Sequence, residues 1–94
     1  MSAARQRPGK HARSVMSDRR WHVLGLAARA VWVELCDVAD ALPHIRSPAR
    51  VAATVDELSR LLAADAADVT PAIDQLVQLG VLEPYRDGFR LKAY

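Results

Sequence analysis

Apolar residues recur every three or four positions between residues 26 and 42. The residues at this spacing, with the apolar side chains beside them, are Val31, Leu35, Val38, Leu42, Trp32, Cys36 and Ala39. Side chains so spaced share one face of a helix, so residues 26–42 are predicted to form a long amphipathic helix with Trp32 in the core. Ser17-Asp18 can cap a short turn over residues 19–24, Gly25 is a break or a cap, and Pro43 ends the long helix.

A second helix is predicted to begin at Thr54. The run Thr54 to Glu57 is a capping box, in which the Thr hydroxyl accepts from the third amide and Glu57 reaches back. Its apolar stripe consists of Val55, Leu58, Leu61 and Leu62. We expect this helix to end near residues 63–64 and residues 64–68 to form a turn.

The pattern predicts a third helix, which starts at either Asp68 or Thr70. Both residues are good N-caps, and in either case Pro71 falls in the first turn, where amides lack intrahelical partners. The predicted buried face is Val69, Ala72, Ile73, Leu76 and Val77, and the outer set is Thr70, Asp74, Gln75 and Gln78. Gly80 is expected to terminate the helix with a positive φ.

The last segment predicts a β-hairpin. Residues 81–85 and 89–92 are β-capable, Asp87-Gly88 is the predicted turn, and Pro84 confines the first strand to an edge or a bulge. A short strand around Val51 is expected to pair with this hairpin. The predicted fold class is therefore mainly α with a small β-hairpin (α+β): a winged helix-turn-helix with three core helices and a two- or three-stranded antiparallel wing.

Charge divides the 94 residues unevenly. Residues 1–20 carry six basic side chains and one acidic one, whereas residues 21–94 carry seven basic and ten acidic ones. Residues 1–16 are polar, basic and interrupted at Pro8-Gly9, which predicts a flexible arm before a winged-helix domain over residues 17–94. Basic arms commonly contact polyanions, while an acidic body disfavours broad non-specific DNA binding.

The run TVDELSRLLAADAADVTPAIDQLVQLGVLEPYRDGFRL resembles winged helix-turn-helix modules of bacterial and phage origin. These share a Thr-capped helix with ELxxLL, then AIxxLxxxGVLE, then a Gly-turned hairpin. Upstream, SDRRWHVLGLAARAVWVEL is similar to the opening of phage replication-initiator and small phage regulatory proteins. The resemblance implies a transcriptional regulator, a replication accessory protein or a protein-docking domain, since the same module serves all three.

The first functional hypothesis is binding of double-stranded DNA. The candidate contacts come from the arm, the third helix and the hairpin: Arg5, Arg7, Lys10, Arg13, Thr70, Gln75, Gln78, Arg86, Arg90 and Lys92. Gln can read adenine, and cations in the arm and wing can hold phosphates. The third helix has no Lys or Arg, however, and Asp68 and Asp74 would repel a DNA backbone.

The alternative hypothesis is a protein-docking module, such as a small phage-encoded inhibitor of anti-CRISPR type that binds a host nucleic-acid-handling complex. An acidic body suits a basic nucleic-acid channel. A homodimer formed through Trp21 and Trp32 is a variant of this hypothesis.

Enzymatic chemistry is not predicted. The three histidines are scattered, no Cys/His cluster has metal-ligand spacing, and neither a phosphate-binding Gly loop nor a nucleophile elbow is present. We therefore expect no cofactor and no small-molecule substrate. A single cysteine and the lack of a long apolar run favour a cytoplasmic protein without membrane association.

Overall fold

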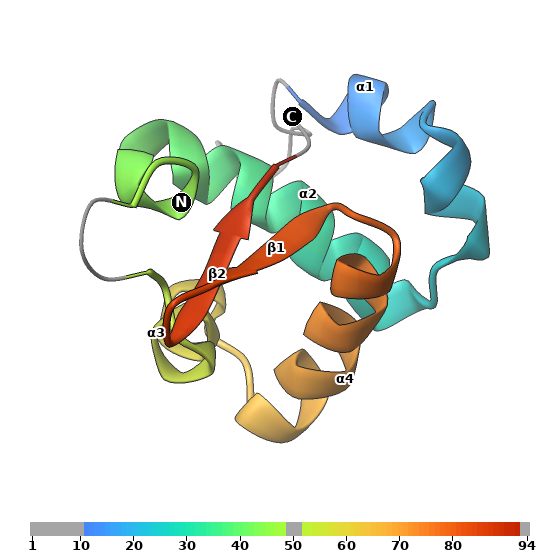
Figure 1. Cartoon of the computed structure of the whole chain (residues 1–94). Coiled ribbons are helices and arrows are strands. Elements are labelled where there is room, and N and C mark those ends of the chain that lie inside the picture. The colour runs from blue at the N-terminus through green and yellow to red at the C-terminus, as the bar shows by residue number, and fades with distance from the viewer. Residues whose placement is uncertain (1–10, 49–51, 93–94) are drawn as a thin grey trace, which may run out of the picture.

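A computed structural model describes residues 11–48 and 52–92 of the chain and places them in a mainly helical fold with one antiparallel hairpin (Figure 1). The predicted class, mainly α with a small antiparallel β-hairpin, is thus confirmed. The elements in chain order are α1 (Ala12–Met16), η2 (Arg19–Val23), α2 (Leu26–Ala41), η3 (Pro43–Ile45), α3 (Val55–Leu62), α4 (Ala66–Gln78), β1 (Leu82–Tyr85) and β2 (Gly88–Leu91).

The core lies where α2, α3 and α4 pack together, with the hairpin in front of α2 in Figure 1. Trp32 and Leu35 of α2 are fully buried, and so is Leu76 of α4. These are the apolar positions that the helical spacing predicts to face inward. Burial of such side chains contributes about 1.5–3 kcal/mol each, so the three-way helix contact holds the fold together.

Helix α2 begins at the predicted residue and ends one residue short of the predicted span of residues 26–42. Gly25, in extended conformation, is its N-cap, and the helix ends at Ala41, two residues before Pro43. The segment that follows the helix begins at Pro43. It forms the short 3-10 turn η3, whose Ile45 is buried against the core.

Helix α3 begins at the predicted cap, where the Thr54 hydroxyl accepts a hydrogen bond from the Glu57 amide at 3.2 Å. The other half of the predicted capping box is replaced by a contact to η3, because a Glu57 carboxylate oxygen lies 2.8 Å from His44 Nε2. The helix ends at Leu62, and the next residue, Ala63, has φ 53° and ψ 47°. The Ala64 amide donates to the Ser59 carbonyl at 3.0 Å, as in a Schellman motif, here with alanine in the left-handed position.

Helix α4 starts earlier than either predicted cap. Asp65 is the N-cap, and its carbonyl accepts from the amides of Asp68 and Val69 at 2.9 and 3.0 Å. The sequence prediction of a start at Asp68 or Thr70 is wrong because Ala66 and Ala67 are good helix formers. Pro71 therefore lies inside the helix, beyond the first turn. Its ring removes an amide that the helix would have used.

The end of α4 matches its prediction. Gly80 has φ +77°, its amide donates to the Val77 carbonyl at 3.1 Å, and the Val81 amide donates to the Leu76 carbonyl at 2.9 Å. These two bonds form a Schellman motif. Val81 and Leu76 are both fully buried, so the motif also turns the chain back onto the core.

The hairpin pairs β1 with β2, with Leu82 opposite Leu91 and Tyr85 opposite Gly88. The turn consists of Arg86 and Asp87, so the predicted Asp87-Gly88 turn is wrong by one residue. Gly88 is needed for another reason. A Cβ atom at that position would lie 2.2 Å from the Ala53 carbonyl oxygen.

A third chain segment adds to the wing at one point. Ala53 forms an isolated antiparallel bridge with Phe89, whose amide donates to the Ala53 carbonyl at 2.8 Å. Val51, the centre of the predicted strand, lies outside the described residues. Strand β2 thus lies between Ala53 and β1, which leaves Pro84 on an outer strand where its missing amide costs no ladder bond.

The N-terminal segment differs from the predicted flexible arm at residues 12–16. These residues form α1, which packs on α2 and buries Ala12 and Val15. Val15 belongs to the same core cluster as Trp32 and Leu76, so the packed part of the chain begins before residue 17.

Within the described residues, no helix combines the length and the apolar character required to cross a bilayer.

Candidate binding surface

The outer face of α4 carries acidic side chains and uncharged polar side chains. Thr70, Asp74 and Gln78 are exposed as predicted, and Asp68 is exposed beside them. No Lys or Arg occurs in Ala66–Gln78. In a winged helix this face would meet a DNA groove, so two carboxylates would stand where phosphates come close.

Gln75 does not belong to this outer face, although the sequence predicted it there. Its side chain is half-buried, and its Oε1 accepts a hydrogen bond from the Gly25 amide at 3.0 Å. The bond joins α4 to the N-cap of α2. Because its amide oxygen has this intramolecular partner, Gln75 is a positioning residue between two helices.

Two of the three basic side chains of the hairpin region lie close to the carboxylate of Glu83. Arg90 Nε lies 2.6 Å from one carboxylate oxygen of Glu83, and Lys92 Nζ lies 3.8 Å from the other. Arg86, at the exposed turn, places its guanidinium 5.6 Å from the centre of the Tyr85 ring. Of the three wing cations predicted to bind a partner, Arg86 alone has no acidic partner among the described residues.

The predicted arm contacts divide into two groups. Arg5, Arg7 and Lys10 lie outside the described residues. Arg13 is exposed on α1, and the neighbouring His11 holds α1 to α2 through Nε2, 3.0 Å from an Asp40 oxygen. Helix α1 packs on α2. Arg13 therefore belongs to a different helix from the predicted binding residues of α4.

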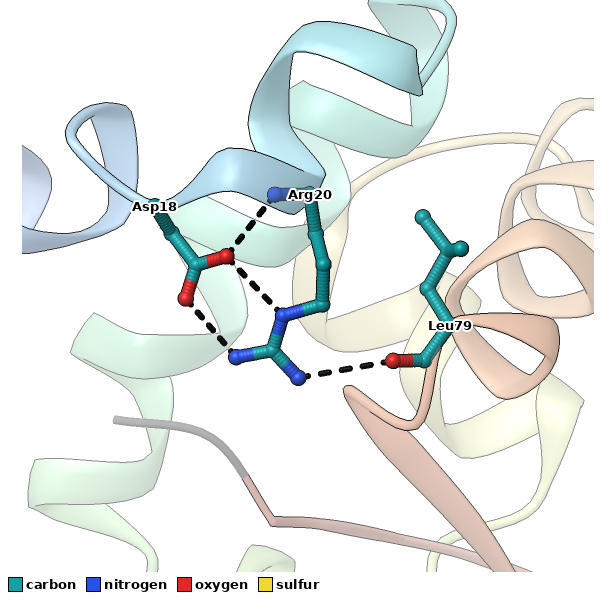
Figure 2. Close-up of polar contacts among 3 residues, drawn as sticks. All are labelled: Asp18, Arg20 and Leu79. Atoms are coloured by element: carbon teal, nitrogen blue, oxygen red, sulfur yellow. Dashed lines mark hydrogen bonds and ion pairs between the residues drawn. The ribbon is translucent and has the colours of Figure 1, made fainter.

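One polar cluster was missed by the sequence analysis, which counted Arg20 only among the six basic residues of positions 1–20. Figure 2 shows its guanidinium held by Asp18, with Nη2 2.7 Å from Oδ2 and Nε 2.9 Å from Oδ1. Nη1 donates to the Leu79 carbonyl at 3.4 Å, at the C-terminal end of α4. A cation at this end is favourable for the helix dipole, so Arg20 ties η2 to α4. The sequence feature that could have indicated this ion pair is the spacing of Asp18 and Arg20, two residues apart.

Trp32 is part of the hydrophobic core. It is fully buried, and its ring centre lies 6.4 Å from that of Trp21. Of the two tryptophans suggested for a homodimer contact, only the half-buried Trp21 reaches the surface. The exposed large apolar side chains of the described residues are Met16, Val23 and Leu26.

Two hollows meet at the turn between α3 and α4. One is an apolar pocket of about 150 Å³ between α2 and α4, and the other is a shallow polar hollow beside Asp65. Asp68 and Ala64 border both. Sequence reasoning missed this surface because it is assembled from three helices.

The described residues show neither a cluster of metal ligands nor a thiol with a lowered pKa. They contain no group of three or more His, Cys, Asp or Glu side chains arranged to hold a metal ion. Burial raises the pKa of the Cys36 thiol to about 11, with Arg46 opposing the shift and Asp37 and Asp40 adding to it. The thiol is therefore protonated at neutral pH and is a poor nucleophile.

Comparison with known proteins adds no relative: no family model, no curated protein and no solved structure matches this chain.

Proposed function

We propose that this protein is a docking module with a winged-helix-like layout, in which α4 and the α3–α4 turn bind a basic surface of a protein partner. The observation that carries the proposal is the charge of the helix pair. Between Val55 and Gln78 there are five acidic side chains and one basic one, Arg60. Such a surface attracts a basic partner and repels a polyanion.

The internal contacts of the candidate DNA ligands support the same proposal. Gln75 is bonded to Gly25, and Arg90 and Lys92 lie against Glu83. Binding phosphate with these wing cations would require competition with a carboxylate already in place. Proteins that handle nucleic acids present basic channels, so a cytoplasmic inhibitor of such a complex is the specific form that we favour.

The test is a pair of NMR titrations of the full chain, with a short DNA duplex and with an arginine-rich peptide. We expect the peptide to shift amide signals of α4 and of the α3–α4 turn, and Asp68→Lys with Asp74→Lys to abolish those shifts. Duplex-induced shifts on α4 that are lost in Thr70→Glu with Gln78→Glu would overturn the proposal.

DNA binding through the basic arm and the wing is the second candidate. It is favoured by the exposure of Arg13 and Arg86 and by the charges of Arg5, Arg7 and Lys10. Five phosphate contacts would make log K fall with log salt at a slope of about −4.5. Replacing Arg5, Arg7 and Lys10 by Gln should then reduce the slope to about −2, whereas it should leave peptide binding on α4 unchanged.

A further inference from the structure

The apolar pocket beside α4 has the size of one side chain. Its volume is about 150 Å³, well below the roughly 300–1,000 Å³ of sites that take small molecules and cofactors. Its walls come from α2, from the end of α3 and from the start of α4. The apolar residues that the argument uses are Ala27, Ala30, Leu62 and Val69.

The rim of this pocket is acidic. Glu34 of α2 and Asp68 of α4 line the same opening. Asp68 also borders the polar hollow, together with Asp65 and Arg60. Within residues 11–48 and 52–92, neither Asp65 nor Asp68 has an ion-pair partner. Arg60 offsets one of these charges, so the two hollows together stay negative.

A buried hydroxyl borders the same place. Ser59 lines the polar hollow and is only 8% exposed, and in the described part of the chain its Oγ has no hydrogen-bond partner. Buried polar atoms are normally paired, because an unpaired one costs about 1–3 kcal/mol. Ser59 therefore adds a polar residue to the wall of the hollow.

An apolar pocket that opens beside an acidic hollow matches a long cationic side chain. Lys and Arg bury their methylene stems on apolar surface and keep the charged end in a polar setting. An aliphatic or aromatic guest would fill the pocket but leave Asp65 and Asp68 unmatched, and an anion would be repelled. The exposed Leu26, 80% accessible and one turn before Ala30 on α2, extends the apolar surface next to the pocket.

We propose that the pocket between α2 and α4 receives one Arg or Lys side chain of the partner protein, with the stem on Ala30 and Val69 and the cation at Asp68. This inference rests on the proposed docking function and names its anchor. The partner therefore presents a protruding basic residue, and the contact contributes specificity as well as charge attraction, because a filled pocket demands one position of that residue.

The experiment is an NMR titration of the full chain with blocked tripeptides that carry Arg, Lys or citrulline between two glycines. Citrulline has nearly the shape of Arg without its charge. We expect Arg and Lys to shift the amides of Ala64, Asp68 and Val69 with a roughly millimolar dissociation constant, as a single side chain can give. Citrulline should bind at least about twofold more weakly, since an exposed ion pair contributes modestly.

Two variants with matched controls locate the contact. Ala30→Leu fills the pocket and should abolish the shifts, whereas Ala41→Leu, at an exposed alanine of α2 away from the pocket, should preserve them. Asp68→Asn should weaken Arg binding about two- to fivefold, whereas Asp87→Asn, the same change at the exposed hairpin turn, should not. All four sites are exposed, so the fold should tolerate each change.

The outcomes separate this inference from the proposed function. Shifts that map elsewhere, that persist in Ala30→Leu, or that are equal for Arg and citrulline would overturn the pocket assignment. An absence of shifts with every tripeptide would overturn it as well, while binding of the arginine-rich peptide to α4 would leave the docking function standing. Duplex DNA bound on α4 would overturn both.

Discussion

The Gly25 amide donates a 3.0 Å hydrogen bond to Gln75 Oε1 and so joins the start of α2 to the last turn of α4. The N-cap of α2 has no side chain of its own to cap the helix. A Cβ at Gly25 would lie 3.7 Å from the Gln75 amide, an ordinary contact, so glycine is not required there for space. The glutamine therefore works as a tether for the backbone of the neighbouring helix.

The first prediction concerns this tether. We expect Gln75→Ala to lower the free energy of unfolding by about 1 kcal/mol, the usual net value of one hydrogen bond. Gln78→Ala, at an exposed glutamine on the same helix, should stay within about 0.5 kcal/mol of the parent. Urea denaturation measures both. Equal stability of the two variants would show that the bond to Gly25 contributes nothing.

A second prediction follows from the approach of Ala53 to the hairpin. Gly88→Ala puts a methyl group 2.2 Å from the Ala53 carbonyl oxygen, so the bridge to Phe89 must open. We expect a loss of at least about 2 kcal/mol of stability. Gly80→Ala is the contrasting change. Gly80 has φ +77°, and a methyl group added there would meet no atom within 4 Å, so only backbone strain of about 1 kcal/mol should appear in the same denaturation assay.

Ala63 gives a stabilising prediction. It ends α3 with φ 53°, a conformation that costs an L-residue about 1–2 kcal/mol. Ala63→Gly should raise the free energy of unfolding by about 0.5–1 kcal/mol, after the added freedom of the unfolded chain is subtracted. Ala67→Gly, inside α4, should instead lose about 0.5–1 kcal/mol. A thermal melt in which both glycines destabilise would contradict the assigned role of Ala63.

Pro71 offers a second stabilising change. It lies inside α4 and is exposed, and with the helix starting at Ala66 its missing amide would have bonded to the Ala67 carbonyl. We expect Pro71→Ala to stabilise the protein by about 1–2 kcal/mol, because the restored bond outweighs the entropy gained by the unfolded chain. Circular dichroism during chemical denaturation measures it. No gain would favour the later helix start, at Thr70.

The buried Cys36 predicts a pH dependence. Its pKa of about 11 in the fold lies above the ordinary value of 9.0, so the unfolded chain loses its thiol proton first. The contribution of Cys36 is therefore constant below pH 9.0, falls as pH rises toward 11, and does not fall further above that range. Cys36→Ala should flatten this part of the stability profile, although it also removes packing at neutral pH. Identical slopes between pH 9.0 and 11 in the two proteins would refute the assignment.

Local patterns were sufficient for most of the fold. The three- and four-residue spacing around Val31 and Leu35 placed α2, Thr54 marked the start of α3, and Gly80 marked the end of α4. Each of these signals acts over a few neighbouring residues, through helical periodicity or through a cap. Such interactions do not depend on how distant parts of the chain pack, and they can therefore be seen in the sequence.

The errors occurred where competing local signals were close in strength. Asp65, Asp68 and Thr70 all suit a helix N-cap, and helix-favouring alanines moved the start to the first of them. At the hairpin, Asp87-Gly88 has a good turn sequence, but the turn lies one residue earlier because Gly88 is needed where the chain passes Ala53. The requirement for glycine comes from Ala53, which precedes α3 and α4 in the sequence, whereas the hairpin follows them.

The sequence alone determined the helix–link–helix–hairpin order and the absence of cations from α4, because both depend on residue types along a continuous segment. Only the tertiary structure decided that Gln75 faces Gly25, that Arg20 reaches Leu79, and that Asp68 borders a pocket shared with α2. Each of these joins residues from separate elements. Side-chain partners across elements are set by how the helices pack, and that packing minimises the free energy of the whole core rather than of any one segment.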